Sequence, residues 1–171
     1  ERDRSRLAEN VANSNTLSEL AERLNCELPD VKQNDSEWDV LKQSGNRVRH
    51  IAKELETLEN ATKELANQHL PSLSALLGPL LAARICVTAH GRMRLARMPA
   101  GTLQVLGAEK AFFHHLKTGA PPPKHGHIFM HPWISRAPQW QRGKISRTLA
   151  SKAALAARSD AFGGEIWGEE R

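Results

Sequence analysis

The sequence changes character at Leu70–Pro71, and this change limits the folds that the chain can adopt. Before it, apolar residues recur every three or four positions in a charged background, which is the heptad pattern of a coiled-coil-like helix. After it, the chain becomes apolar and rich in alanine, which is typical of buried, closely packed helices. Neither part shows a strand pattern of useful length. We therefore expect an all-α fold.

Residues 1–70 are expected to form an amino-terminal, antiparallel coiled-coil-like helical arm. Thr16 and Glu19 have the spacing of a capping box, and the leucine-rich helix that follows should end at Pro29. A second helix should begin after a polar loop at residues 30–35. We expect its apolar stripe to pack within the arm, with self-association of two arms as the alternative. The stripe contains Val48, Ile51, Leu55, Leu58, Thr62 and Leu65.

Residues 71–162 are expected to form a second helical domain, followed by a polar tail at residues 163–171. Gly78–Pro79 should bend the first helix of this domain, because proline removes a backbone donor and crowds the preceding turn. Glycine at the end of that helix should close it. The later predicted elements are closure at His90–Gly91, a basic connector at 92–99, a helix at 102–116, a stiff proline-rich loop at 119–126 and a last helix at 137–162.

The two parts of the chain differ in net charge as well as in hydropathy. Residues 1–70 contain 10 Lys and Arg against 14 Asp and Glu, whereas residues 71–160 contain 13 against 2, namely Glu109 and Asp160. A block with a net charge of +11 repels itself unless an anionic partner neutralises it. Nucleic acid is the leading candidate, and a merely soluble basic surface is the alternative. No apolar run is long enough to span a membrane, so we expect no membrane partner.

The scarcity of acids in the basic block argues against catalysis. General acid–base chemistry needs a carboxylate or histidine beside a partner of different pKa, and the sequence has no Walker loop, dinucleotide fingerprint or zinc-protease motif. A cluster of His125, His127 and His131, with His114 and His115 upstream, could hold zinc or nickel but has no evident further ligand. We expect no enzyme activity, no cofactor and no metal, with a His-cluster metalloprotein as the weakest alternative.

Four phrases in fixed order resemble a known family. They run from Leu76 to Arg84, from Met98 to Lys110, from Pro121 to Gly126 and from Arg142 to Phe162. Together they resemble the Nop domain, which is shared by the archaeal and eukaryotic box C/D ribonucleoprotein scaffolds and, more distantly, by a spliceosomal scaffold. The resemblance covers residues 71–162, and its Gly-Ala-Glu-Lys phrase is closer to the box C/D branch.

This resemblance implies an RNA-binding surface. In the family, the histidine of the proline-His-Gly loop stacks on a base of a kink-turn RNA, and His125 matches that histidine. The alternative is a histidine that caps its own loop. The last helix of the family presents basic residues to the RNA backbone, although without the match they would be interpreted as a solvated face. The implied RNA-binding residues are Lys124, His125, Arg142, Lys144, Arg147, Lys152 and Arg158.

The resemblance also implies a protein partner, a small ribosomal-like protein that binds the kink-turn. Two stretches of the chain, before and after residues 101–106, correspond to the surface that meets this protein. For the glycine and alanine of the second stretch, the alternative is that they permit tight helix packing. The implied contact residues are Arg97, Ala100, Gly107, Ala108, Glu109 and Lys110.

Two residues depart from the family pattern. His114 stands where box C/D members usually have arginine, and His90 stands where glycine is usual. These departures leave open a helical protein-interaction adaptor that has lost RNA binding. The amino-terminal fibrillarin-binding domain of the family is not expected within these residues, so a fibrillarin-type methyltransferase would be recruited through regions outside them.

The resemblance and the charge together predict a non-enzymatic scaffold. It should recognise a kink-turn, box C/D-type RNA together with the small protein, and so assemble a ribonucleoprotein for rRNA processing. Shape and phosphate contacts should dominate over base sequence. The expected location is cytoplasmic in an archaeon and nuclear or nucleolar in a eukaryote.

Overall fold

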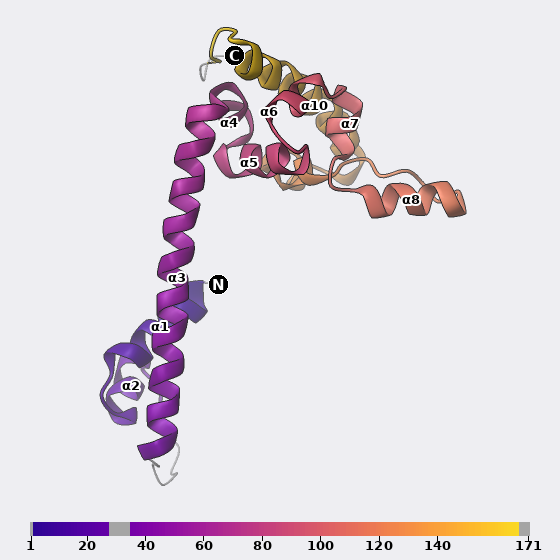
Figure 1. The fold of residues 1–171 in the computed structure, drawn as a ribbon. Coiled ribbons are helices and arrows are strands. Elements are labelled where there is room, and N and C mark those ends of the chain that lie inside the picture. Colours follow the sequence, from indigo (N-terminus) through magenta and orange to yellow (C-terminus); the bar gives the residue numbers. More distant parts are fainter. Residues whose placement is uncertain (1, 28–34, 168–171) are drawn as a thin grey trace. The chain divides into compact units, whose positions relative to one another are not determined.

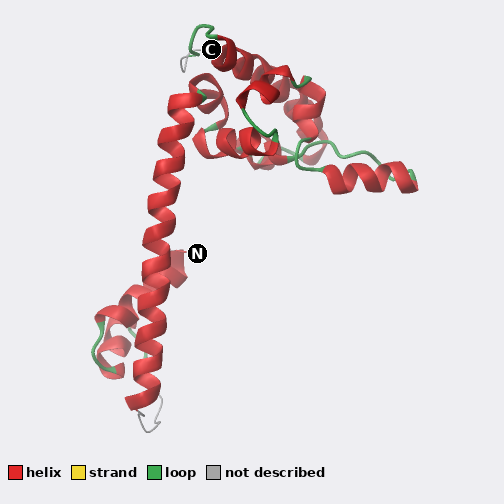
Figure 2. Cartoon of the chain, viewed as in Figure 1, coloured by secondary structure: helices red, strands yellow, loops and turns green. Residues whose placement is uncertain are grey.

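The computed structural model describes residues 2–27 and 35–167, and the regular structure in these residues is helical throughout (Figure 2). The all-α prediction is therefore confirmed for the described part of the chain. Two compact units divide the chain, Glu1–Glu59 and Asn60–Arg171, and we refer to them as unit 1 and unit 2. The long helix α3 (Asp35–His69) contributes residues to both units and ends next to the predicted domain division at Leu70–Pro71.

Unit 1 is built from α1 (Arg2–Asn13), α2 (Leu17–Leu24) and the first part of α3 (Figure 1). The sequence pattern did not predict α1, because Ala8 and Val11 are the buried apolar residues in it and two such residues make no recognisable stripe. The helices of unit 1 are joined by side chains: the Trp38 indole N–H donates to the Asn15 carbonyl at 2.9 Å.

The predicted capping box at the start of α2 is confirmed, with one difference. The Thr16 hydroxyl accepts from the Glu19 N–H at 3.3 Å, while the Glu19 carboxylate accepts from the N–H of Asn15 at 2.8 Å, one residue before the cap. Asn25 closes the helix in the left-handed conformation, with φ of 52°. The helix therefore ends before Pro29, which lies outside the described residues, as does most of the predicted loop that follows it.

The apolar stripe of α3 is solvent-exposed in this chain, so the expectation that it packs within the arm was wrong. Its aliphatic members have exposed fractions between 44% and 66%. The reason is orientation: α1 packs on the side of α3 that carries Gly45 and Arg49 and lies beside α3 as far as Glu56, so the stripe, on another side of α3, is left uncovered. The exposed aliphatic residues of the stripe are Val48, Ile51, Leu55, Leu58 and Leu65.

After the last part of α3, unit 2 continues with α4 (Pro71–Leu77) and α5 (Pro79–Thr88), between which the chain bends by 116°. The bend predicted at Gly78–Pro79 is thus confirmed and is sharp enough to make two helices. The pair carries buried leucines and isoleucine into the core of the unit. Among the described residues, no single helix is long and apolar enough to cross a membrane, and this bent pair meets the criterion only in combination.

Two predictions for the middle of unit 2 were wrong. The expected connector at residues 92–99 is largely a helix, α6 (Arg92–Arg97), because Leu95 and Ala96 are buried in the core and give this basic segment an apolar side. The expected helix at residues 102–116 is interrupted, which gives α7 (Ala100–Val105) and α8 (Glu109–Thr118). α5 ends at Thr88, next to the closure predicted at His90–Gly91, but the residue in the left-handed conformation is His90, with φ of 60°, and not the glycine. Glycine adopts this conformation more easily.

The last helix, α10 (Gln139–Phe162), lies at the centre of unit 2 and confirms the helix predicted at residues 137–162. It packs against α4, α6, α7 and the short α9 (Pro132–Ser135), which follows the 3₁₀ turn η1 (His127–Met130). The inward side of α10 carries small residues, so the neighbouring helices approach closely. These buried residues are Ser146, Ala150, Ala153, Ala154, Ala156 and Ala157, together with Leu149.

Asp160 connects the end of α10 to the start of α4. Its two carboxylate oxygens accept from the N–H groups of Ser72 and Leu73, at 2.8 and 2.9 Å. The first N–H groups of a helix have no partner within the helix, and the positive end of the helix dipole favours a carboxylate. One of the two acids in residues 71–160 is therefore a structural cap.

We predict that Asp160→Ala lowers the free energy of unfolding of unit 2 by roughly 2 to 3 kcal/mol, because two partly buried N–H groups lose a charged acceptor. Urea denaturation followed by circular dichroism measures the change. Glu64→Ala, which removes an exposed carboxylate from α3, is the matched control and should change stability by less than about 0.5 kcal/mol. Equal midpoints for Asp160→Ala and the wild type would contradict the capping role.

Candidate RNA and protein interface

The proline-rich loop is held against the end of α7 by hydrogen bonds. The Gln104 side chain donates to the Lys124 carbonyl at 2.7 Å, the Gly126 N–H donates to the Gln104 carbonyl at 2.8 Å, and the His127 N–H donates to the Leu106 carbonyl at 2.8 Å. A Cβ atom at Gly126 would overlap the Leu106 carbonyl, so this close approach requires glycine. The expectation of a structured, non-helical loop is confirmed.

His125 projects from this loop as one layer of an aromatic stack. Its ring lies 4.5 Å from the ring of Phe129, with an angle of 22° between the planes, and the Arg142 guanidinium lies 5.5 Å from the centroid of the same Phe129 ring. Burial lowers the pKa of His125, and the nearby charges of Arg142 and Lys124 act in the same direction. A half-buried, neutral imidazole held in a fixed plane is well suited to stack on a base.

Two of the predicted RNA-binding arginines also hold the fold together. Arg142 donates from Nε to the Ala137 carbonyl at 2.9 Å and from Nη2 to the Ser135 carbonyl at 3.3 Å. Arg158 donates from Nε to the Ala96 carbonyl at 3.1 Å, near the end of α6. The sequence did not reveal these contacts. Arg158 bonds to a segment far from it in the sequence, and Arg142 bonds back to the turn that precedes α10.

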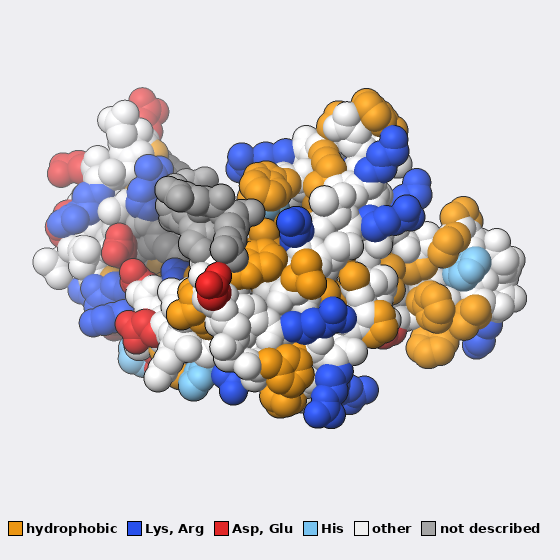
Figure 3. Space-filling view, turned by 90° about the horizontal axis from the view of Figure 1, so that it is seen from above, with side chains coloured by type: hydrophobic (Ala, Val, Ile, Leu, Met, Phe, Trp, Pro, Cys, Tyr) orange, Lys and Arg blue, Asp and Glu red, His pale blue; other side chains and the backbone are white. Residues whose placement is uncertain are grey.

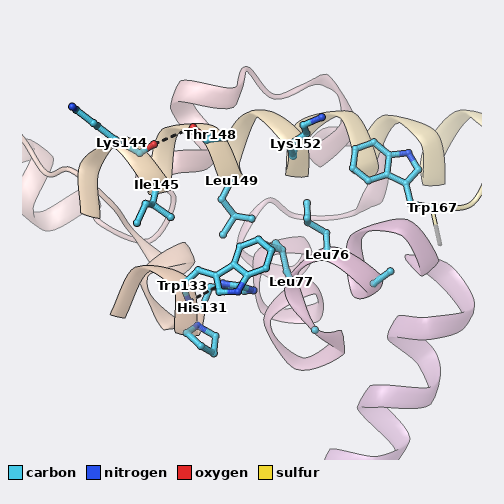
Figure 4. Close-up of a pocket in the computed structure, with 13 residues that line it drawn as sticks. Leu76, Leu77, His131, Trp133, Lys144, Ile145, Thr148, Leu149, Lys152 and Trp167 are labelled. Carbon is cyan, nitrogen blue, oxygen red and sulfur yellow. Dashed lines mark hydrogen bonds between the residues drawn. The ribbon is translucent and has the colours of Figure 1, made fainter. Parts of the chain in front are cut away.

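The predicted basic residues of α10 lie on two of its faces. Lys124 reaches α10 beside Gly143, where a Cβ would lie 3.7 Å from the lysine Cδ. At 3.6 residues per turn, Arg147 lies about 40° around the helix from Gly143, whereas Lys152 lies on the opposite side. Lys144 and Lys152 instead border a cavity between α10, α9 and α4 (Figure 4). The structure therefore groups Arg147 with Lys124 and separates both from Lys152.

The second predicted protein-contact stretch, Gly107–Lys110, contains the joint between α7 and α8 and the first residues of α8. Gly107 has φ of 87°, and a Cβ there would overlap the imidazole ring of His127. The Glu109 carboxylate accepts from the Gly107 N–H at 2.8 Å; hydrogen bonds from its own N–H and from that of Gly107 lower its pKa. Gly107 thus permits close packing, which was the alternative interpretation of this glycine. Contact of this segment with a partner protein stays a prediction.

The first predicted protein-contact stretch, with Arg97 and Ala100, lies at the other end of α7. Arg97 is exposed at the end of α6 and Ala100 is half-buried at the start of α7. Because α7 has six residues, its two ends are about 9 Å apart, so both predicted contact stretches are within reach of one small protein.

α8 extends from the rest of unit 2 and has no buried residue (Figure 1). Apolar side chains gather over it in Figure 3, whereas Lys and Arg side chains are spread over the rest of unit 2 on the face that this view shows. His114, the departure from the family pattern, is exposed on this helix. The apolar side chains of α8 that are exposed are Phe112, Phe113 and Leu116.

The histidines do not gather into one site. In the described residues, no group of three or more His, Cys, Asp or Glu side chains could hold a metal ion. His131 is buried and accepts from the Trp133 N–H at 3.2 Å, while His115 hydrogen-bonds to the Ala120 carbonyl and His127 packs against the Gly107 joint. Each of these histidines supports a different local structure.

A family model connects this geometry to known proteins. The model of the Nop family, described as "snoRNA binding domain, fibrillarin", matches residues 3–170. The chain belongs to the Nop family. The match begins in α1, so the Nop family pattern includes the arm as well as the residues 71–162 that carried the resemblance.

Curated relatives in the Nop family come from archaea and eukaryotes. An uncharacterized NOP5 family protein of Methanocaldococcus jannaschii is 46% identical over 132 residues, which cover 77% of this chain and 32% of the relative. Nucleolar protein 56 of Homo sapiens is 42% identical over 117 residues, which cover 68% of this chain and 20% of the relative. The chain thus spans about a third and a fifth of the length of these Nop proteins.

A solved structure supports the same assignment. One chain in a crystal structure of a fibrillarin/Nop5p complex matches with a TM-score of 0.57 and 28% identity, covering 97% of this chain and 59% of that chain. The Nop resemblance and the helical Nop fold predicted from the sequence are therefore confirmed.

We predict that Gly107→Ala lowers the free energy of unfolding by more than about 2 kcal/mol, because alanine resists the left-handed conformation and would overlap His127. Gly101→Ala is the matched control within the neighbouring α7: nothing lies near the added methyl group, so it should stabilise by about 0.5 to 1 kcal/mol. Thermal unfolding of both variants measures the difference. A Gly107→Ala protein as stable as the wild type would show that the joint is not fixed.

Proposed function

We propose that this Nop family chain is part of a ribonucleoprotein scaffold that binds a kink-turn, box C/D-type RNA together with a small kink-turn-binding protein, and that it acts by binding and not by catalysis. The observation that carries the proposal is the rigid loop that presents His125 and Lys124 beside the basic face of α10. The family description and the relatives named nucleolar protein 56 support a scaffold in box C/D particles.

On this proposal, His125 stacks on an unstacked base of the RNA. Phe129 and Arg142 support the imidazole from behind, which keeps its plane fixed before the RNA arrives. Lys124 and Arg147 contact phosphates on the same side of α10, with Arg158 further along that side. Lys152, which the resemblance also implied, lies on the opposite side of α10, and Lys144 borders the same cavity as Lys152, so the proposal does not depend on either lysine.

The small protein would contact both ends of α7, through Arg97 and Ala100 at one end and Gly107, Ala108, Glu109 and Lys110 at the other. Gln104 of α7 also holds the Lys124 carbonyl of the RNA-binding loop. A protein bound at α7 therefore lies next to the RNA contact. RNA and protein together form a composite surface for this chain, which is why we expect their binding to be coupled.

The wider particle follows from the relatives. We propose that a fibrillarin-type methyltransferase is recruited through parts of the scaffold outside these residues, since the similar solved chain is in complex with fibrillarin. Such a particle would act in rRNA processing, in the nucleolus of a eukaryote, as the relatives named nucleolar protein 56 suggest, or in the cytoplasm of an archaeon.

A second candidate function is a helical adaptor that joins protein chains. The exposed apolar stripe of α3 favours it, because an aliphatic stripe of heptad spacing is usually covered by another helix. We propose that two arms associate through this stripe. Self-association is compatible with RNA binding, whereas an adaptor in the strict sense would bind no RNA.

The RNA proposal predicts coupling. Affinity for a kink-turn RNA should rise by about 1 to 3 kcal/mol when the small protein is already bound to that RNA. Filter binding or calorimetry with naked and protein-bound RNA measures this difference. Equal affinities would contradict the composite surface, and no RNA binding in either case would favour the adaptor.

In the same titrations, two substitutions should weaken RNA binding in different ways. His125→Ala removes a stacking platform, so it should cost roughly 1 to 3 kcal/mol and leave the salt dependence unchanged. Arg147→Ala should instead lower the slope of log affinity against log salt by about one unit, because one phosphate contact is lost. Lys152→Ala, on the opposite face, is the matched charge control and should change the slope less. The reverse pattern would mean that the roles are misassigned.

The arm proposal predicts that the protein forms dimers and that Ile51→Gln with Leu55→Gln prevents them, because both side chains lie in the exposed stripe. Sedimentation equilibrium measures the oligomeric state. Val87→Gln changes an exposed aliphatic residue of α5 outside the stripe and should leave the dimer intact. A wild type that stays monomeric at high concentration would exclude self-association through the arm.

A further inference from the structure

A cavity of about 840 Å³ lies within unit 2 between α4, α9 and α10, and Trp167 stands at one end of it (Figure 4). We call it the tryptophan cavity. Its volume is in the range of protein sites that enclose a small ligand or a few side chains. Aliphatic side chains that continue into the core of the unit form its floor: Leu76, Leu77, Ile145 and Leu149.

Two polar side chains that line the tryptophan cavity, His131 and Thr148, are already hydrogen-bonded. The buried His131 accepts at Nδ1 from the Trp133 N–H at 3.2 Å, and its ring also hydrogen-bonds to the backbone of Leu76. The Thr148 hydroxyl donates to the Lys144 carbonyl at 3.2 Å. A polar group of an occupant would therefore lose its bonds to water at the floor and find no replacement there. This chemistry disfavours a nucleobase, which has polar edges, and favours an apolar side chain.

The two tryptophans make the tryptophan cavity a strong site for such a side chain. Trp133 lies beside the cavity with 64% of its surface exposed, and Trp167 is half-buried across from it. Large aromatic side chains in pockets are the residues that contribute most to binding at protein interfaces. Their exposure next to an apolar floor indicates a surface that a partner covers.

The rim of the cavity is positively charged. Lys144 and Lys152 are exposed on α10 and extend in opposite directions along it in Figure 4. Neither of the two acids in residues 71–160 is directed at these lysines, because Asp160 caps α4 and Glu109 bonds to the α8 joint. The lysines are two helical turns apart, about 12 Å along the helix, so they flank the apolar floor.

We propose that the tryptophan cavity is a docking site for an acidic segment of a partner protein, which inserts one large apolar side chain between Trp133 and Trp167 and places carboxylates against Lys144 and Lys152. On a helical segment that runs along α10, the carboxylates would lie one turn before and one turn after the apolar anchor. The cavity lies on the side of α10 opposite to Lys124, so the partner and the proposed RNA bind at different faces.

The test uses the full chain and two pools of fluorescein-labelled helical peptides. In one pool a central phenylalanine is flanked at one turn on either side by glutamates, and in the other by lysines. Fluorescence anisotropy should show tighter binding of the glutamate pool. Trp133→Ala should weaken that binding by on the order of tenfold or more. Trp140→Ala is the matched control, since Trp140 is 71% exposed on α10 but outside the cavity, and should bind as the wild type does.

A charge exchange gives an independent measurement. Lys144→Glu with Lys152→Glu should reverse the preference and select the lysine pool, a result that a general loss of structure cannot produce. Trp133→Ala should also keep the wild-type affinity for kink-turn RNA, which separates this proposal from the RNA proposal.

Three results would overturn the docking proposal. One is equal binding of the two pools by the wild type. Another is displacement of the glutamate peptides by a single-stranded RNA in the wild type but not in Trp133→Ala, which would assign the cavity to RNA. The third is a dimer that dissociates in Trp133→Ala, which would assign the cavity to a second copy of the chain.

Discussion

Close packing on the small-residue face of α10 determines where the functional side chains of unit 2 lie. Alanines along this helix let α4, α6 and α7 approach it closely, and the buried residues of α10 carry no charge. The basic residues must then occupy the remaining faces, and the neighbouring helices divide these faces into two. One face meets α7 and the proline-rich loop, and the other borders α4 and α9. The packing of one side of α10 thus leaves two outward surfaces: one beside α7 and the proline-rich loop, and one that borders the cavity near α4 and α9.

The side of unit 2 proposed to bind RNA depends further on backbone contacts between the loop and α7. Gly126 fits against Leu106, and Gly107 fits against His127, so the two glycines hold the loop and the α8 joint together. His125 is positioned by this arrangement and by its stack on Phe129. The proposed contacts with RNA and with the small protein share one short helix, which gives a direct physical route for coupling between them.

Local signals explain what could be predicted from the sequence. Prolines and glycines at residues 78–79 and 119–126, and the helical pattern after residue 137, specify backbone geometry within a few residues, and these predictions were confirmed. Predictions failed where distant contacts decide. α6 is a helix because Leu95 and Ala96 meet the core, and the α7–α8 break arises where Gly107 meets His127. For the same reason the supporting contacts of Arg142 and Arg158 and the tryptophan cavity left no signal in the sequence.

The bond between Asp160 and the start of α4 joins positions 88 residues apart in the sequence. Because α10 supplies the surface on which α4, α6 and α7 pack, the core of unit 2 cannot close until its last helix has been synthesised. On the ribosome, the apolar surfaces of α4 and α5 therefore stay exposed to solvent until the segments that cover them have been synthesised. Newly made chains of this protein pass through a stage that exposes aggregation-prone surface, and protection during that stage is a requirement that follows from the order of the helices.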